Sequence, residues 1–274
     1  MGDGLLRGTE WFLTLDAERC NELPRPSRRC ITRPSAGATC ASGGSIYTRA
    51  SANANGTGSV SVSGGQRGIE ASGCSLNLAN NTNNNSNMQF TGAVAAMYLR
   101  NSTMSLFNAL IANSGDGINA VGSNMEMDRV AISNSSENGV SLQDSSINLS
   151  NAAISNSGAC GLNLKRSTGV LGTSSITSSG VTQSWASGIC ADGSDVDISG
   201  GMVFSNNVGG DVKTGLGGAV VLQSWNGASS FPDFASVNSL ECWTAGSHIY
   251  VFPGATTQDL STVYANSLCV SFEG

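Results

Sequence analysis

The sequence predicts an all-β fold, a right-handed parallel β-helix in which coils of about 22 residues stack into a solenoid. Three observations predict it. A pattern of apolar residues recurs at a fixed spacing, proline is absent between Ser35 and Phe231, and charged residues make up only 12% of the 274-residue chain. Because proline cannot donate a hydrogen bond to a strand ladder, its absence from the body of the chain favours a continuous sheet.

The repeat is carried by residues at offsets 0, 2, 7 and 9 of each copy, which are mostly apolar. Seven copies begin at Ile69, Met97, Ile118, Val140, Leu162, Ile189 and Val212. Residues two apart lie on one face of a strand, so the offsets predict short strands that each bury one face. An earlier, looser copy uses Ile46, Val60 and Val62. We therefore expect about seven or eight coils, with equivalent apolar residues stacked inside.

Other residues recur with the same period. Two longer steps between copies indicate insertions at residues 80–87 and 180–187. Polar residues share two turns, one with Ser102, Ser123, Ser145, Ser167 and Ser194 and the other with Asn113, Asn134 and Asn156. The asparagine amides are expected to hydrogen-bond along the axis. Glycine precedes the first strand at Gly117, Gly139, Gly161 and Gly188. We expect these glycines to provide positive φ angles at a corner.

Three stretches carry this pattern most clearly: GDGINAVGSN, NGVSLQDSS and ASGICADGSDVDISG. They resemble the repeats of right-handed parallel β-helix proteins, which include pectate lyases, bacterial surface proteins and phage tailspikes. The resemblance covers about residues 69–226. It is specific for the fold and unspecific for activity, because one scaffold of this kind can host many functions.

The composition divides the chain into an N-terminal segment (1–40), the β-helix (41–226) and a C-terminal segment (227–274). Six of the 13 basic residues lie in the first segment, at Arg7, Arg19, Arg25, Arg28, Arg29 and Arg33. We expect this segment to cap the open end of the solenoid or to attach it to other virion proteins. The last segment is rich in aromatic residues and is expected to form a cap. The tailspike resemblance implies a trimerisation element or a receptor-binding head there.

The overall charge and the N-terminus exclude several classes of function. The net charge is −6 and no basic block is present, so no nucleic-acid partner is expected. The N-terminal residues show no basic region followed by an apolar stretch, so we expect neither a signal peptide nor membrane insertion.

The eight cysteines and the single histidine bear on metals and disulfides. No cysteine pair has metal-ligand spacing and His248 is the only histidine, so we expect no metal or other cofactor. Without a secretion signal, most cysteines are expected to be small buried apolar residues. A disulfide between Cys242 and Cys269 is the alternative considered.

Candidate catalytic residues are few and weak. Asp195 and Asp197 are expected on one strand face, about 7 Å apart, and Asp116 and Glu137 at one corner of adjacent coils, about 5 Å apart. Either pair could bind a cation or act as an acid and a base. Glu126 and Asp197 would lie about 14 Å apart, whereas glycosidases need about 5 to 9.5 Å. Since exposed carboxylates are common, solvated surface residues are the simpler interpretation.

Tryptophans are the stronger candidates for ligand binding. Trp185 falls in the second insertion, and Trp225 and Trp243 follow the last repeat. An exposed aromatic ring presents a large apolar surface on which a sugar can stack. The alternative is that such a ring folds back to cover the edge of a coil.

These observations favour a structural and recognition role over catalysis. The leading hypothesis is a subunit of a phage tail fibre or tailspike, located in the virion, that forms a homotrimer and binds host surface polysaccharide. One alternative is a polysaccharide lyase or glycoside hydrolase on the same scaffold. The other is a bacterial surface adhesin.

Overall fold

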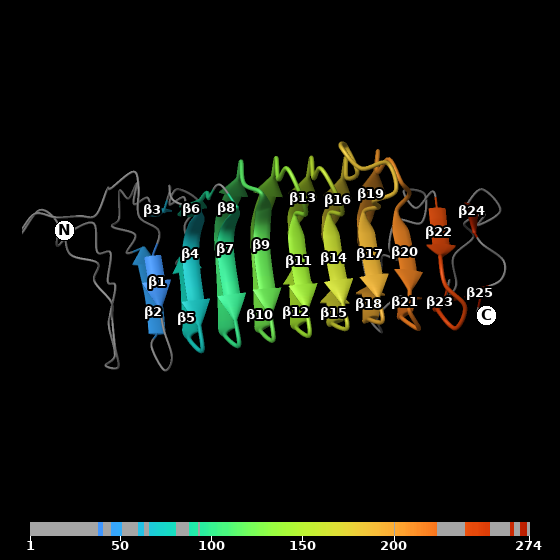
Figure 1. The fold of residues 1–274 in the computed structure, drawn as a ribbon, viewed down its shortest axis with the longest axis horizontal. Helices are drawn as coiled ribbons and strands as arrows, with labels where there is room; N and C mark the ends of the chain where they lie inside the picture. The colour runs from blue at the N-terminus through green and yellow to red at the C-terminus, as the bar shows by residue number, and fades with distance from the viewer. Residues whose placement is uncertain are drawn as a thin grey trace, which may run out of the picture.

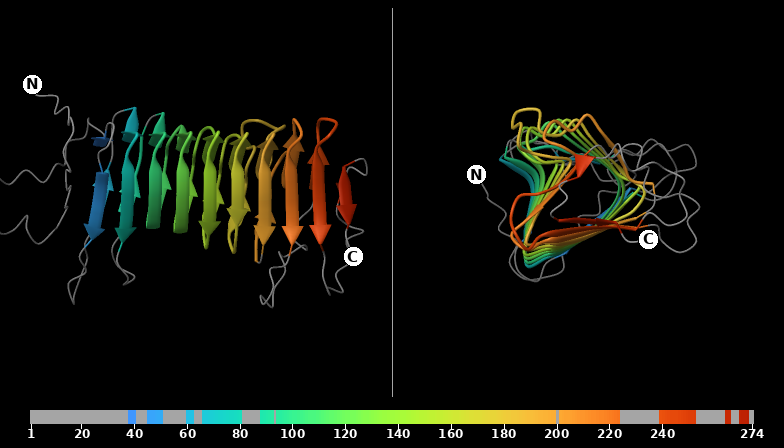
Figure 2. Two further views of the ribbon diagram at one scale, coloured as in Figure 1. Left: turned by 90° about the horizontal axis from the view of Figure 1, so that it is seen from below. Right: turned by 90° about the vertical axis from the view of Figure 1, so that its right-hand side faces the viewer.

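The chain forms a right-handed parallel β-helix of triangular cross-section in the computed structural model (Figures 1 and 2). The structure describes residues 38–40, 45–50, 60–62, 66–80, 88–92, 94–199, 201–223, 239–252, 264–265 and 269–272. Within these residues the strands form one 10-stranded and one 15-stranded sheet, and every strand pair is parallel. The predicted fold class is confirmed.

The first strand of each coil lies in the 10-stranded sheet, whose outer surface we call face 1. Its strands are β1 (Ala38–Cys40), β4 (Arg67–Ser72), β7 (Ala95–Arg100), β9 (Asp116–Val121), β11 (Val140–Gln143), β14 (Leu162–Lys165), β17 (Ile189–Asp192), β20 (Val212–Gly215), β22 (Ser239–Cys242) and β24 (Tyr264–Ala265). Face 1 is toward the viewer in Figure 1.

The second and third strands of each coil form the 15-stranded sheet, whose outer surfaces we call face 2 and face 3. Face 2 carries β2 (Ser45–Ala50), β5 (Ser75–Asn80), β12 (Ser146–Ser150), β15 (Thr168–Leu171), β18 (Asp195–Ser199), β21 (Ala219–Gln223), β23 (His248–Phe252) and β25 (Val270–Phe272). Face 3 carries β3 (Val60–Val62), β6 (Met88–Phe90), β13 (Ala153–Ser155), β16 (Ser175–Thr177) and β19 (Val203–Ser205). The long strands β8 (Thr103–Ala112) and β10 (Asn124–Ser133) turn the corner and contribute to both.

The register of the stacked coils agrees with the sequence pattern. Ile118 pairs with Val140, and Val140 pairs with Leu162. All three side chains are fully buried in one continuous core. A single coil could not bury this apolar surface, so the stack is the cooperative unit.

The coils extend beyond the segment in which the repeat is recognisable. On the N-terminal side, Ala38 pairs with Ile69 and Ile46 pairs with Leu76, which adds a coil. On the C-terminal side, β22 and β23 continue both sheets, with Leu240 beside Val212. The predicted boundary at residue 226 therefore does not mark the end of the helix, because strands on its far side pair in register. Of the N-terminal segment (1–40) that was predicted to cap the solenoid or attach it to virion proteins, residues 1–37 lie outside the described residues.

The polar turns confirm one expectation. Asn113, Asn134 and Asn156 have φ of 54°, 56° and 54°, a left-handed conformation that asparagine tolerates better than most residues. Their amides stack along the axis, with Asn134 Nδ2 donating to Asn113 Oδ1 at 3.5 Å and Asn156 Nδ2 to Asn134 Oδ1 at 3.3 Å. The serine turn is also a ladder. The Ser145 hydroxyl, for example, accepts the N–H of Ser123 and donates to the carbonyl of Gln143.

The corner glycines have a different cause from the one expected. Gly117, Gly139, Gly161 and Gly188 are not among the residues with positive φ. A Cβ on Gly139 would stand 2.5 Å from the Gly161 carbonyl oxygen and 2.5 Å from the Ile154 methyl group. Glycine is required there because adjacent coils approach too closely for any side chain.

The expectation that most cysteines are unpaired core residues is wrong for Cys74, Cys160, Cys190, Cys242 and Cys269, which all form disulfides. Cys160 bonds to Cys190, Cys242 bonds to Cys269 as the sequence alternative had it, and Cys74 is disulfide-bonded as well. The sequence spacing gave no signal because the Cys160–Cys190 pair crosses from one coil to the next. Stacking brings their Cα atoms to 6.1 Å although they are 30 residues apart in the chain.

Candidate functional site

The insertion at residues 180–187 folds against face 1 and is held there by backbone hydrogen bonds. The N–H groups of Gly180 and Val181 donate to the carbonyls of Ala159 and Ser157, and those of Thr182 and Gln183 donate to the Gly158 carbonyl. On the other side, Gly209 N–H donates to the Ala186 carbonyl. The insertion is therefore anchored to the coil before it and the coil after it.

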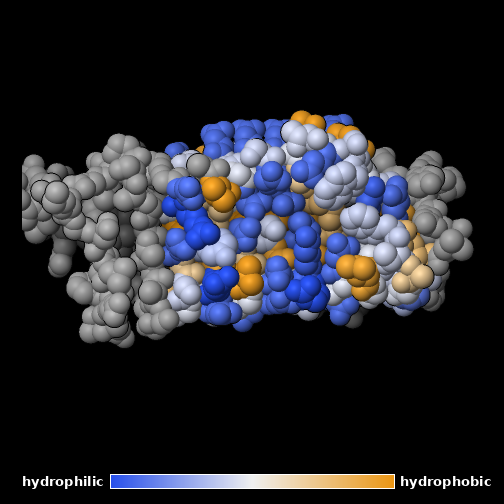
Figure 3. Space-filling view, in the orientation of Figure 1, coloured by the Kyte–Doolittle hydropathy of each residue, from blue (hydrophilic) through white to orange (hydrophobic). Residues whose placement is uncertain are grey.

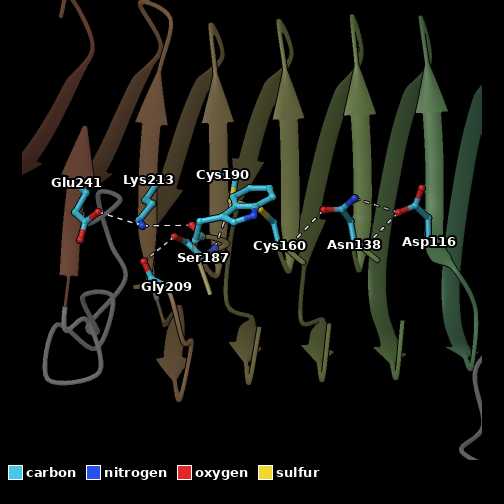
Figure 4. The surroundings of a disulfide bond; sticks show 9 residues. Asp116, Asn138, Cys160, Ser187, Cys190, Gly209, Lys213 and Glu241 are labelled. Carbon is cyan, nitrogen blue, oxygen red and sulfur yellow. Dashed lines mark hydrogen bonds and ion pairs between the residues drawn. A yellow bond between two sulfur atoms is a disulfide. The ribbon is translucent and has the colours of Figure 1, made fainter. Parts of the chain in front are cut away.

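A small apolar cluster outside the main core fixes the base of the insertion. It consists of Ala159, Cys160, Ala186 and Cys190, all buried, with the disulfide at its centre. Cys190 lies in β17 with its side chain on face 1, where the insertion covers it. Figure 4 shows the disulfide in line with the polar residues of neighbouring coils. The cluster leaves the insertion little freedom to move away from the stack.

Two tryptophans from distant segments meet on this rigid base. Trp185 is in the insertion, and Trp243 directly follows β22, where its backbone N–H donates to the Thr214 carbonyl. Their ring centroids lie 6.4 Å apart with an angle of 34° between the planes. Trp185 is 52% exposed and Trp243 is 48% exposed. We call this pair the tryptophan platform.

Gly215 makes room for one ring of the platform. A Cβ on Gly215 would stand 2.8 Å from Cδ1 and Nε1 of Trp243 and 2.8 Å from Oδ1 of Asp192. Trp243 therefore lies against bare backbone, and the Asp192 carboxylate borders the same space. The three residues occupy adjacent coils, since Asp192 pairs with Gly215 and the next strand leads to Trp243.

The charged residues near the platform are mostly balanced. Lys213 Nζ lies 3.2 Å from Glu241 Oε2 and also donates to the Trp185 carbonyl at 3.3 Å. The line from Glu241 through Lys213 to the insertion can be followed in Figure 4. Asp192 lies beside Lys165 on the neighbouring strand. Burial raises the pKa of Asp192 above its ordinary value, and the charge of Lys165 partly offsets that rise. Asp192 thus presents an acceptor that no hydrogen bond within the described residues occupies.

The surface around the platform is mainly hydrophilic. Figure 3 shows face 1 with its hydrophobic residues in separate spots rather than in one broad patch. Leu216, which directly follows β20, is an exposed apolar residue in this region, with 71% of its surface exposed. Broad apolar patches are typical of protein interfaces, so this surface is better suited to a polar ligand.

The predicted tryptophans have different outcomes. The structure brings Trp185 and Trp243 together, whereas Trp225 lies outside the described residues. The sequence identified each ring as a candidate, but nothing in it indicated that the two would touch. Their contact depends on which coil the insertion folds against.

The predicted carboxylate pairs lie elsewhere. Asp195 and Asp197 are exposed on face 2, on the outer side of β18. Asp116 lies one position out of register with Glu137 and instead accepts hydrogen bonds from Asn138, whose N–H and side-chain amide donate to Oδ1 at 3.0 and 3.1 Å. The Glu137 side chain receives a weak hydrogen bond of 3.5 Å from Gln183 in the insertion. Neither pair is part of the platform, although Glu137 touches the insertion that carries Trp185. Asp116 is already occupied as a structural acceptor.

A shallow trough of about 390 Å³ is a second surface feature, on face 2. It crosses β8, β10, β12 and β15. Its outward-pointing residues are Thr103, Ser105, Asn124, Glu126, Ser146, Asn148, Thr168 and Val170. Glu126 is the one carboxylate in this lining.

Clusters of metal-ligating side chains and long apolar helices are both absent from the described part of the chain. No three His, Cys, Asp or Glu side chains gather there in a group that could hold a metal ion. In the same residues no helix is long and apolar enough to cross a membrane.

Comparison with known proteins adds a distant structural similarity. No protein-family model and no curated protein matches the sequence. Among solved structures, the chain is similar to an alginate lyase from Paenibacillus sp. str. FPU-7, with a TM-score of 0.44 and 12% identity over 97% of this chain and 99% of that chain. A similarity of this extent carries no information about substrate or reaction.

Proposed function

We propose that this protein is a rod-shaped recognition protein that binds carbohydrate at the tryptophan platform. The observation that carries the proposal is the convergence of Trp185 and Trp243, two half-exposed rings on a base fixed by a disulfide. Sugars present apolar C–H faces that stack on such rings. A platform held in place before binding loses little conformational entropy when the ligand arrives.

The alternative, that the rings cover the edge of a coil, accounts less well for their position. The base of the insertion is already closed by Ala159, Ala186 and the disulfide, and the main core is buried beneath face 1. Even in this position each tryptophan side chain remains about half exposed. Exposing two of the largest apolar side chains side by side favours a ligand-binding role.

A glycan microarray probed with the full chain tests the proposal, followed by calorimetric titration of any glycan that binds. Trp185→Ala and Trp243→Ala should each weaken binding about tenfold or more, because each removes one stacking surface. Leu216→Ala is the matched control, since Leu216 is a more exposed apolar residue outside the platform. Equal affinity of the wild type and both tryptophan variants would remove the basis of the proposal.

The biological setting that we propose is attachment of a virion to a host surface. A stiff solenoid that holds one glycan site at a fixed place suits this role, and the tailspike resemblance of the repeats motivates it. The proposal includes a homotrimer and an N-terminal connection to other virion proteins. Immunogold labelling of virions with an antibody to this chain would test the setting, and labelling confined to a bacterial surface would favour an adhesin instead.

Polysaccharide cleavage is the second candidate, and the trough on face 2 is the observation that favours it. The trough lies across the coils, so an extended glycan along the axis would pass Glu126. Asp197 lies in the same row of side chains, with Asn148 and Val170 between them. If the wild type releases reducing ends from a polysaccharide and the Glu126→Gln variant does not, the result would support cleavage. Intact polysaccharide after long incubation with the wild type would exclude it for the glycans used.

A further inference from the structure

The space beside Gly215 adds a polar partner to the tryptophan platform. Asp192 Oδ1 and the pyrrole edge of Trp243 each lie 2.8 Å from the point where a Gly215 Cβ would stand. A sugar ring stacked on Trp243 would therefore have the Asp192 carboxylate at its rim. A carboxylate accepts hydrogen bonds on both oxygens, which suits a pair of neighbouring sugar hydroxyls.

We propose that Asp192 selects the ligand of the platform, so that the site takes a neutral, hydroxyl-bearing sugar and rejects a uronic acid at the same position. This inference rests on the proposed function and names the chemical class of its ligand. Asp192 is the binding residue that sets the specificity, and Gly215, which has no side chain, lets Asp192 and Trp243 lie close together.

The charges around the site support a neutral ligand. Lys213 is engaged by Glu241 and by the Trp185 carbonyl, so its charge is already compensated. Lys165 is the other cation, and it stands opposite Asp192 on the adjacent strand. Arg166, at the following corner, is bound to Asp144 with Nε to Oδ1 at 2.8 Å. Each of these three cations already has a carboxylate neighbour. Their positive charge is therefore less available to balance the negative charge of a uronate.

The acceptor is also partly shielded from solvent. Asp192 is only partly exposed, and burial raises its pKa. Hydrogen bonds to a charged acceptor are stronger than those between neutral groups. A second carboxylate brought beside Asp192 would instead meet repulsion that weakens binding by about tenfold or more at contact distance.

The test compares matched oligosaccharides that differ only in the oxidation of C6. Calorimetric titrations would use hexamers of glucose and glucuronate, of galactose and galacturonate, and of mannose and mannuronate, each pair with one linkage. The neutral member of the pair that binds should bind at least tenfold more tightly than its uronate. Asp192→Ala should remove most of that difference, and Asp192→Asn, which keeps a carbonyl acceptor, should retain part of the affinity.

Two results would overturn the inference while leaving the proposed function intact. One is a uronate that binds the wild type as well as its neutral partner while Trp243→Ala abolishes both. The other is an Asp192→Ala variant with unchanged affinity and unchanged preference. If no glycan binds the wild type, on the array or among the hexamers, the proposed function itself fails. Circular dichroism of the Asp192 variants, compared with wild type, separates a lost contact from a lost fold.

Discussion

Single residues set the geometry of each coil, and the sequence showed some of them better than others. Asn113, Asn134 and Asn156 could be predicted because stacked asparagines leave a periodic signal, and their amides do hydrogen-bond along the axis. Gly139 and its equivalents were also visible as a period. The physical reason for these glycines could not be predicted from the sequence, because the close approach of the next coil's carbonyl oxygen is a tertiary contact.

The glycine account predicts a large difference between two apparently similar substitutions. Gly139→Ala should destabilise the protein by about 2–3 kcal/mol, because its Cβ would overlap the Gly161 carbonyl and Ile154. Gly172→Ala is the control, since its Cβ would find ordinary contacts at 3.6 and 3.8 Å. Urea denaturation measures both. Equal stability of the two variants would contradict the steric explanation.

Gly215 offers a residue-scale test of the platform itself. Gly215→Ala should displace Trp243 or Asp192, because the new Cβ would stand 2.8 Å from each. We expect glycan affinity to fall about tenfold with little loss of stability, since both neighbours are side chains that can move. The measurement is calorimetric titration with the array-selected glycan. Unchanged affinity would show that glycan binding does not depend on the positions of Trp243 and Asp192 beside Gly215.

Asp128 gives the stability a dependence on acid. Burial raises the pKa of Asp128, but hydrogen bonds from Asn151, Ser150 and Arg129, with the charge of Arg129, outweigh burial and lower it overall. A carboxyl with a lowered folded pKa stabilises the protein above its unfolded pKa of about 3.9, and that stabilisation is lost as the pH falls. Asp128→Asn should therefore lose less stability than the wild type between about pH 6 and about pH 3. An equal loss in urea titrations at the two pH values would contradict this assignment.

At the scale of elements, the insertion at residues 180–187 is what turns a regular stack into a site. The sequence located it, because it lengthens one repeat. The sequence did not show that Cys160 and Cys190 would be joined, or that Trp185 would reach Trp243. Both contacts link different coils, and their positions follow from the stacking register together with the path of the insertion, which carries no periodic signal.

The disulfide under the insertion predicts a local effect and a global one. Cys160→Ala with Cys190→Ala should lower the free energy of unfolding by about 3–4 kcal/mol, the value expected for closing a loop of this length. The same double variant should become cleavable by proteases within 180–187 while the coils stay resistant. Limited proteolysis followed by mass spectrometry measures the second effect. An insertion that stays as resistant as in the wild type would mean that its backbone hydrogen bonds suffice.

On the scale of the whole molecule, the stack separates structure from recognition. The fold was predictable in detail, since each coil repeats one apolar pattern and like residues pair in register. The ends were less predictable because β22 and β23 depart from the repeat in sequence while continuing both sheets. Backbone pairing tolerates such changes as long as the inward residues remain apolar.

The proposed attachment role predicts a homotrimer. A tailspike-like attachment rod, as proposed above, implies that three chains associate side by side. Sedimentation equilibrium should give three times the chain mass of 27.9 kDa. A monomer that persists at high protein concentration would argue against a tailspike-like assembly and leave glycan binding to be tested separately.

A crystal structure of the protein with the array-selected oligosaccharide would show where on the rod the glycan binds. We expect a sugar ring stacked on Trp185 or Trp243 at about 4 Å, with its hydroxyls donating to Asp192. A sugar bound elsewhere, for example in the trough across β8 to β15 with the platform bare, would contradict this expectation.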